Sequence, residues 1–217
     1  MTLKFKLLGI LLLTIFMNSC NGQDKPMNFD YGRVENNKYV NTFFEFEITL
    51  PTDWIVQTKE QMDDMTRKGK ALVAGDDSKM EAVLKASEIN SANLLSVFQF
   101  ERGSAVEYNP SFSIVVENIK NLPGIKTGNE YLFQAKKLME QSQLKYDYID
   151  KEFSKEVING TDFYKMNAEI KYMGLDIKQI YYVTIQKGFA FVAITSFIND
   201  QQKQDLLKSI NSMKFKN

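Results

Sequence analysis

The stretch TDFYKMNAEIKYMGLDIKQIYYVTIQKGFAFVAITSFI, residues 161–198, decides the fold of this chain. It consists of segments rich in strand-forming residues, separated by Met173-Gly174 and Lys187-Gly188 and preceded by Asn159-Gly160. Asn-Gly favours a type I′ turn because both central residues need positive φ, and the other two glycines suit the same geometry. The spacing predicts strands at 146–158, 161–172, 175–186 and 189–198, joined as an antiparallel meander.

The last of these strands is expected to lie in the middle of a sheet. In residues 189–197 both alternating sets of side chains are mostly apolar, whereas a strand with one wet face would alternate apolar and polar residues. Both faces of the strand are therefore expected to be covered.

Further elements can be predicted on either side of this stretch. Strands are expected at 43–50, 94–101 and 112–117. Helices are expected to follow capping residues at Thr58 (with Gln61 as a capping box), Asp77, Asn129 and Asp200. The predicted class is α+β, a mostly antiparallel sheet flanked by helices as a sandwich.

The first 20 residues, MTLKFKLLGILLLTIFMNSC, indicate export. Lys4 and Lys6 precede an apolar run of about eleven residues, which is short against the roughly 20 needed to span a bilayer and is typical of a signal peptide. Met17-Asn18-Ser19-Cys20 resembles the lipobox of bacterial lipoproteins, in which the Cys becomes the acylated N-terminus. The alternative is an ordinary secretory signal with a chance cysteine. Cys20 is the only cysteine of the chain, so it forms no intramolecular disulfide.

These observations predict the organisation of the chain. A cleaved signal would cover 1–19, a lipidated tether 20–37, and one α+β domain 38–217. Several acyl chains on Cys20 would hold the protein firmly at a membrane. Residues 20–217 carry 25 basic and 27 acidic side chains, a balance without the basic footprint of a nucleic-acid-binding protein.

The order of elements resembles a known family. The features that carry the resemblance are an aromatic-rich strand ending in Pro51-Thr-Asp-Trp54, a hairpin-rich second half, a Gly-Phe-Ala-Phe strand and a closing Ser212-Met-Lys-Phe215. Together they are similar to the PsbP-like α/β/α sandwich, which includes photosystem II extrinsic subunits, a Ran-binding nuclear import factor and bacterial lipoproteins. The resemblance implies the fold and favours a role in binding or assembly.

The chain has few residues suited to catalysis. It contains no histidine, which removes the commonest general base and imidazole metal ligands, and Cys20 is committed to lipid. No phosphate-binding glycine loop or dinucleotide fingerprint is present. We therefore expect no catalytic residue, no cofactor and no metal site.

Several short patterns have both a functional and a structural interpretation. Ser142-Gln-Leu-Lys145 and Lys126-Thr-Gly128 match two penicillin-binding signatures, in reversed order and without the third, so a helix end and a loop are the alternative. Asp63-Asp64 and Asp76-Asp77 offer calcium ligands but lack the spacing of a calcium loop, which favours caps and solvated faces. Asn159-Gly-Thr161 matches a glycosylation triplet, and a hairpin turn explains it better.

Several apolar residues also have both a functional and a structural interpretation. The first set is methionines: Met62, Met65, Met80 and Met139. They either line a groove that binds a peptide or lipid, or pack in the core. An exposed amphipathic patch, or else core, is expected from Tyr172, Tyr181 and Tyr182. Trp54 either caps a ligand pocket or packs in the core.

The resulting expectation is a lipoprotein of the bacterial cell envelope, anchored through Cys20 to a membrane, with the outer membrane favoured. Its domain would bind another envelope protein without catalysis. The alternatives are a carrier of a small apolar ligand or lipid, and a carboxylate-based hydrolase.

Overall fold

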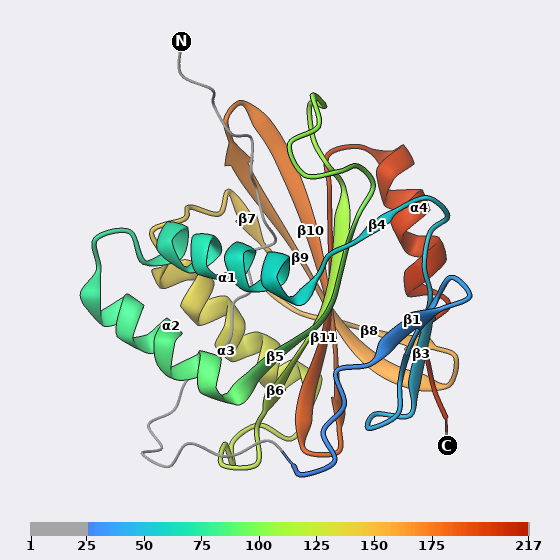
Figure 1. Ribbon diagram of the computed structural model, residues 1–217. Helices are drawn as coiled ribbons and strands as arrows, with labels where there is room; N and C mark the ends of the chain where they lie inside the picture. The colour runs from blue at the N-terminus through green and yellow to red at the C-terminus, as the bar shows by residue number, and fades with distance from the viewer. Residues whose placement is uncertain (1–25, 217) are drawn as a thin grey trace.

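The computed structural model describes residues 26–216 (Figure 1). Its helices are α1 (Lys59–Ala74), α2 (Ser78–Asn90), α3 (Gly128–Gln141) and α4 (Asp200–Ile210). Its strands are β1 (Arg33–Glu35), β2 (Lys38–Asn41), β3 (Phe46–Thr49), β4 (Ile55–Val56), β5 (Ser91–Phe98), β6 (Ser111–Asn118), β7 (Tyr148–Ile149), β8 (Ser154–Ile158), β9 (Thr161–Tyr172), β10 (Leu175–Gln186), β11 (Phe189–Phe197) and β12 (Lys214–Phe215).

The main sheet has the order β4-β5-β6-β11-β10-β9-β7, with β8 also paired to β9, and all its pairings are antiparallel. All nine residues of β11 are buried, as expected for a central strand. The predicted α+β class and the C-terminal meander are both confirmed.

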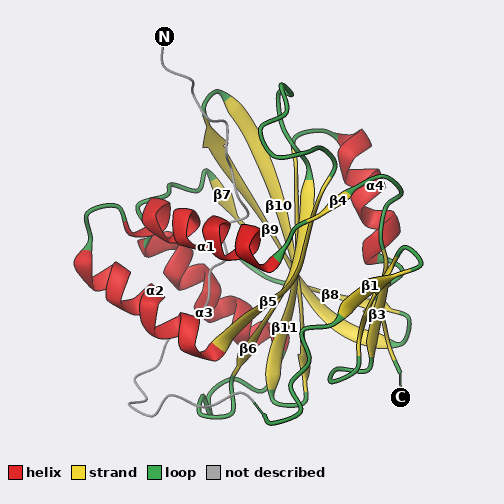
Figure 2. Ribbon diagram, viewed as in Figure 1, coloured by secondary structure: helices red, strands yellow, loops and turns green. Residues whose placement is uncertain are grey.

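The two faces of the main sheet are covered differently (Figure 2). Helices α1, α2 and α3 lie over one face, while α4 and a small sheet of order β1-β2-β3-β12 lie over the other. The sequence predicted helices on both faces and no second sheet. Aromatic packing holds this sheet in place: the ring centroid of Phe191 in β11 lies 4.7 Å from that of Phe46 and 5.1 Å from that of Phe215.

The three predicted two-residue turns are confirmed, and all their residues have positive φ. The values are 46° and 82° at Asn159-Gly160, 51° and 83° at Met173-Gly174, and 51° and 82° at Lys187-Gly188. This backbone twist matches that of the paired strands, so β8, β9, β10 and β11 follow one another as hairpins.

The strand expected at 146–158 is interrupted. Its ends form β7 and β8, which both pair with β9. Between them the Asp150 carboxylate accepts hydrogen bonds from the backbone N–H and the side-chain amide of Asn167, both at 2.7 Å. This side chain therefore substitutes for a strand carbonyl and lets residues 151–153 leave the ladder.

Shorter corrections concern the other strands. The strand expected at 43–50 begins only at Phe46, because Glu45 has a φ of 52° and closes a turn with Thr42. The strand expected at 94–101 lies at Ser91–Phe98, and the one expected at 112–117 is one residue longer at each end.

The helix caps were partly predicted. The Thr58–Gln61 capping box and the Asp77 cap are confirmed. The caps of α3 and α4 lie earlier than expected, at Thr127 instead of Asn129 and at Asn199 instead of Asp200. In each case a neighbouring residue with extended backbone presents its side-chain oxygen to the N–H three positions on.

The folded region begins before residue 38, the expected end of the tether. Strand β1 pairs with β2, and the Phe29 ring lies 5.3 Å from that of Phe43 and 5.8 Å from that of Phe189. Cys20 and the predicted signal peptide lie outside the described residues. Within residues 26–216, no helix combines the length and the apolar character that a membrane span requires.

Candidate functional site

The Ser-x-x-Lys pattern lies at the end of α3, where it has a structural role. The hydroxyl of Ser142, which is fully buried, lies 2.8 Å and 2.7 Å from the carbonyl oxygens of Met139 and Leu144 and donates toward them. The Lys145 amine donates to the backbone carbonyl of Ser142 and not to its hydroxyl. The serine proton is thus committed to backbone carbonyls at the end of α3, as the structural interpretation predicts.

The Lys-Thr-Gly pattern forms the start of the same helix. Thr127 caps α3 in a box with Glu130. Gly128 packs against the backbone of Val183 in β10, where a Cβ atom would lie 2.4 Å from the carbonyl oxygen. These residues therefore dock α3 on the sheet.

Three residues of the acidic pairs, Asp63, Asp64 and Asp77, serve in ion pairs or as a cap. Asp77 caps α2, and Asp63 pairs with Lys59 at 2.6 Å. Among the described residues, no group of three or more His, Cys, Asp or Glu side chains is placed to hold a metal ion. Asn159 of the glycosylation triplet donates from its side-chain amide to the carbonyls of Asn211 and Met213.

Most of the apolar candidates belong to the core. Met80, Met139, Tyr181 and Tyr182 are buried, and Trp54 is half-buried against the core beneath the small sheet.

Two of the candidates, Met65 and Tyr172, meet at a pocket of about 320 Å³. It lies where the tip of the β9–β10 hairpin and the loop 99–110 approach α1. In Figure 1 the hairpin tip and this loop lie at the top of the molecule. We call this cavity the hairpin pocket. Its lining consists of Met65, Phe98, Arg102, Gly103, Ser104, Val106, Glu107, Tyr108, Asn109, Tyr172, Met173, Gly174, Leu175 and Ile177.

Three buried apolar side chains form part of the wall of the hairpin pocket. Met65, Phe98 and Ile177 are buried core side chains from three different elements. The Tyr108 hydroxyl forms a hydrogen bond with the Ser196 hydroxyl of β11, and burial raises the pKa of Tyr108 well above its ordinary value. This tyrosine is therefore neutral at physiological pH, and the inner wall carries no charge from it.

The loop that forms one wall is closed at its neck. The side chain of Asn109 accepts from the Phe100 backbone N–H at 2.9 Å and donates to the Phe100 carbonyl at 2.7 Å. The Gln99 N–H donates to the Pro110 carbonyl at 3.0 Å. These bonds continue the β5–β6 ladder and hold the pocket wall in place.

Charged residues mark the side of the pocket next to α1. The Arg102 guanidinium donates through Nη2 to Asp64 at 3.0 Å, and Asp64 also accepts from Lys68 at 2.8 Å and from Arg67. Hydrogen bonds from Lys68 and Arg102 lower the pKa of Asp64 to about 2. One carboxylate thus serves three cations on the α1 side of the pocket.

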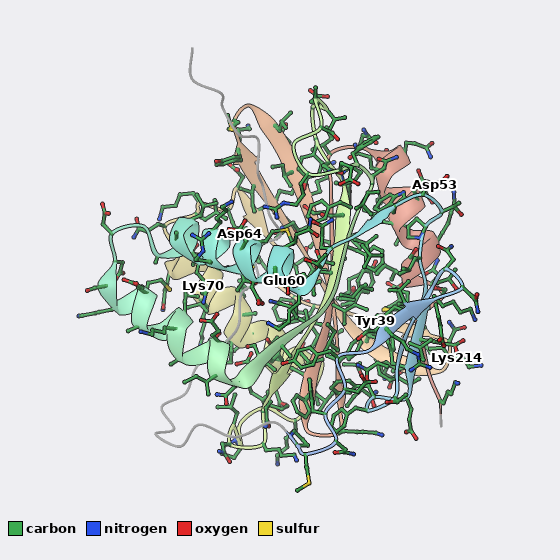
Figure 3. All side chains as sticks on the ribbon, viewed as in Figure 1. Tyr39, Asp53, Glu60, Asp64, Lys70 and Lys214 are labelled. Atoms are coloured by element: carbon green, nitrogen blue, oxygen red, sulfur yellow. The ribbon has the colours of Figure 1, made fainter. Side chains whose placement is uncertain are left out.

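A second hollow of about 670 Å³ lies between α1, α2 and β5, on the other side of Asp64. Its wall includes the ion pairs Lys59–Asp63 and Lys70–Glu88. The side chains of Asp64 and Lys70 both come from α1, as Figure 3 shows. The acidic and basic side chains that line this hollow neutralise each other.

Sequence reasoning missed Arg102, Tyr108 and Met173 as residues of the site. The loop 99–110 has no motif, and its residues meet the β9–β10 turn only in the folded chain. Met173 was identified solely as a turn residue. Its large apolar side chain at an exposed turn with positive φ was the available signal.

No protein family model matches the sequence, and no curated protein matches it. Several solved structures match in fold. A protein from Bacteroides thetaiotaomicron has 11% identity and a TM-score of 0.43, over 85% of this chain and 50% of that one. This chain therefore spans half the length of that protein.

Two other structures are covered more fully. CyanoP, the cyanobacterial PsbP of Synechocystis, has 15% identity and a TM-score of 0.48, over 82% of this chain and 91% of that one. LpqN of Mycobacterium tuberculosis, described as involved in cell envelope biogenesis, has 11% identity and a TM-score of 0.41, over 77% and 78%. A PsbP protein is thus among the structures that this chain resembles. Likenesses of this level concern the fold alone.

Proposed function

We propose that this chain is a lipoprotein of the bacterial cell envelope whose folded domain is a non-catalytic module that binds another envelope protein through the hairpin pocket. The observation that carries the proposal is the position of this preformed pocket relative to the start of the described chain. The lipobox-like Met17-Asn-Ser-Cys20 and the absence of histidine from the sequence support the other parts of it.

The pocket and the start of the described chain lie at opposite ends of the main sheet. Phe29 contacts Phe189, directly after the Lys187-Gly188 turn at one end of β10. Leu175 and Ile177, at the other end of this twelve-residue strand, line the pocket. At about 3.3 Å per residue, the strand separates the two ends by about 36 Å. Figure 1 shows the same arrangement, with the blue start at the bottom.

A lipid on Cys20 would orient the domain relative to the membrane. Only residues 21–25 separate Cys20 from Pro26, and this length of chain spans at most about 20 Å. The Phe29 end of the domain would therefore stay near the membrane, and the hairpin pocket would face away from it. A partner that approaches from the aqueous side meets the pocket first.

The carrier of a small apolar ligand remains the second candidate, because Met65, Phe98 and Ile177 form an apolar inner wall. The volume of about 320 Å³ is at the small end of the range of ligand sites, which is about 300–1,000 Å³. A pocket of this size suits one side chain of a partner better than a long acyl chain.

Site-specific photocrosslinking in intact cells tests the binding role. A photoreactive residue at Met173, which is 54% exposed at the pocket rim, should capture a reproducible envelope protein. Val157 on β8, 63% exposed and away from the pocket, is the matched control and should not capture it. Equal capture at both positions, or none at Met173, would contradict the proposal.

The anchor has its own test. The Cys20→Ser variant should lose acylation and move to the soluble fraction, because a single cysteine carries the lipid. If this variant stayed bound to the membrane as firmly as the parent, the lipoprotein assignment would be wrong.

A further inference from the structure

The charges around Asp64 leave Arg102 available to an anionic ligand. Asp64 is shared by Lys68, Arg67 and Arg102, and one carboxylate neutralises only one of these three cations. Arg102 alone among the three also lines the hairpin pocket. Arg102 therefore presents a guanidinium whose partner Asp64 is shared with two other cations, and an acidic group of a ligand would complement it at the pocket.

The guanidinium of Arg102 retains donors for such a group. Arginine has five N–H donors in a planar fork, and within the part of the chain that the structure describes Arg102 uses Nη2 for its bond to Asp64. Its side chain is 21% exposed, which is enough to reach a bound group while much of it stays desolvated. A planar fork of this kind recognises a carboxylate through two parallel hydrogen bonds.

Other acidic residues lie near this end of the molecule. Glu101 precedes Arg102 in the loop 99–110 and is exposed. Asp176 follows the hairpin tip and pairs with Lys171 at 3.5 Å. Glu107 is part of the pocket lining, and among the described ion pairs it has none with Arg102. Glu107 would repel an anion placed on its side of the mouth, so the carboxylate of the ligand should lie on the α1 side, beside Arg102.

The volume of the pocket limits the size of the apolar group that a ligand can carry beside its carboxylate. Met65, Phe98 and Ile177 bound a space of about 320 Å³, which suits one large apolar side chain. The C-terminal residue of a polypeptide carries its side chain and its carboxylate on the same Cα atom. It can therefore fill the pocket and reach the adjacent Arg102 at once, whereas an internal residue of a chain has an amide in place of the carboxylate.

We infer that the hairpin pocket binds the C-terminal residue of its partner protein, with a large apolar side chain against Met65, Phe98 and Ile177 and the terminal carboxylate on Arg102. This inference rests on the proposed binding function and specifies its partner. It does not depend on the lipid anchor.

Peptide binding to the mature chain, residues 20–217 with Cys20→Ser, tests the inference by ¹⁵N NMR titration. The probes are Gly-Ser-Gly-Ser-Phe with a free carboxylate, the same peptide as its C-terminal amide, and octanoate. The free-acid peptide should shift signals of the loop 99–110 and of residues 172–177, and it should bind at least about tenfold more tightly than the amide.

Two variants separate a specific contact from general charge. Arg102→Gln should abolish the preference for the free acid and leave the weak binding of the amide unchanged. Lys68→Gln removes a cation from the same Asp64 but not from the pocket lining, so it should keep most of the preference. Loss of the preference in both variants to the same extent would overturn the role given to Arg102.

The remaining outcomes are equally decisive. Equal affinity for acid and amide peptides overturns the inference. Octanoate binding at the pocket more tightly than the peptide also overturns it and favours the carrier. If no probe binds while crosslinking at Met173 still captures a partner, the C-terminal recognition is wrong and the proposed binding function stands.

Discussion

The substitution Gly128→Ala tests how α3 is docked on the sheet. A Cβ atom at this first residue of α3 would lie 2.4 Å from the carbonyl oxygen and 3.0 Å from the carbonyl carbon of Val183. Val183 belongs to β10, which is hydrogen-bonded to β9 on one side and to β11 on the other. The strand cannot yield easily, so the helix start has to move.

The expected change in the free energy of unfolding is the balance of two opposing effects. Overpacking a well-filled core costs about 1–3 kcal/mol. Replacing glycine with alanine restricts the unfolded chain, which stabilises the fold by about 0.4–1 kcal/mol. The net expectation is a loss of about 1–2 kcal/mol in the free energy of unfolding, or about 2–8 °C in Tm for a domain of this size.

Urea denaturation of the mature Cys20→Ser chain, followed by far-UV circular dichroism and by the fluorescence of Trp54, the single tryptophan, measures this loss. Gly124→Ala is the matched control, because nothing lies within 4 Å of its Cβ position and it should change stability by less than about 0.5 kcal/mol. If Gly128→Ala were as stable as this control, the close contact between α3 and β10 would be refuted.

Three further predictions concern other parts of the fold. Thr127→Ala should cost about 1 kcal/mol by removing the capping hydroxyl of α3, and an unchanged urea midpoint would argue against that cap. Phe191→Ala, at a fully buried position, should cost about 3–5 kcal/mol, while Phe133→Ala, 51% exposed, should cost no more than about 1 kcal/mol; similar losses would show that the core is misplaced. Because the pKa of Asp64 is lowered to about 2 from 3.8, its ion pairs should contribute fully above about pH 4 and be lost as the pH falls toward 2. Arg102→Gln should raise the pKa of Asp64 in a carboxyl ¹³C NMR titration, and an unchanged value would contradict the pairing.

The C-terminal half of the fold was predictable because its signals are local. Asn159-Gly160, Met173-Gly174 and Lys187-Gly188 specify tight turns, and the strands between them pair with their neighbours in sequence. The bounds of β9 and β10 agree with the prediction at both ends. Thr58 and Asp77 were equally local signals, since a cap needs only the residues of one helical turn.

The small sheet was not predictable from local pattern. Its strands β1, β2, β3 and β12 have two to four residues each, too few for a clear alternation. The pairing of β12 with β3 joins Phe215 to Phe46, from opposite ends of the chain. The caps of α3 and α4 were each misplaced because a second capping residue stood within two positions of the true one.

The candidate site was also predictable only in part. Met65 and Tyr172 were candidates because of their residue type, but neither pattern indicated a common location. The hairpin pocket forms only when the loop 99–110, the β9–β10 turn and α1 meet at one end of the sheet. The ion pair beside it joins Arg102 to Asp64, which are 38 residues apart in the sequence.

By itself, the sequence determined the α+β class, the order of the meander, the central place of β11 and the prediction of a lipid anchor at Cys20, because each depends on residue type over a short span. The tertiary structure alone decided that a second sheet covers β11 and that a pocket beside Arg102 lies at the end of β10 opposite to Phe29. These features depend on contacts between segments distant in sequence, whose partners are selected by the packing of the whole core.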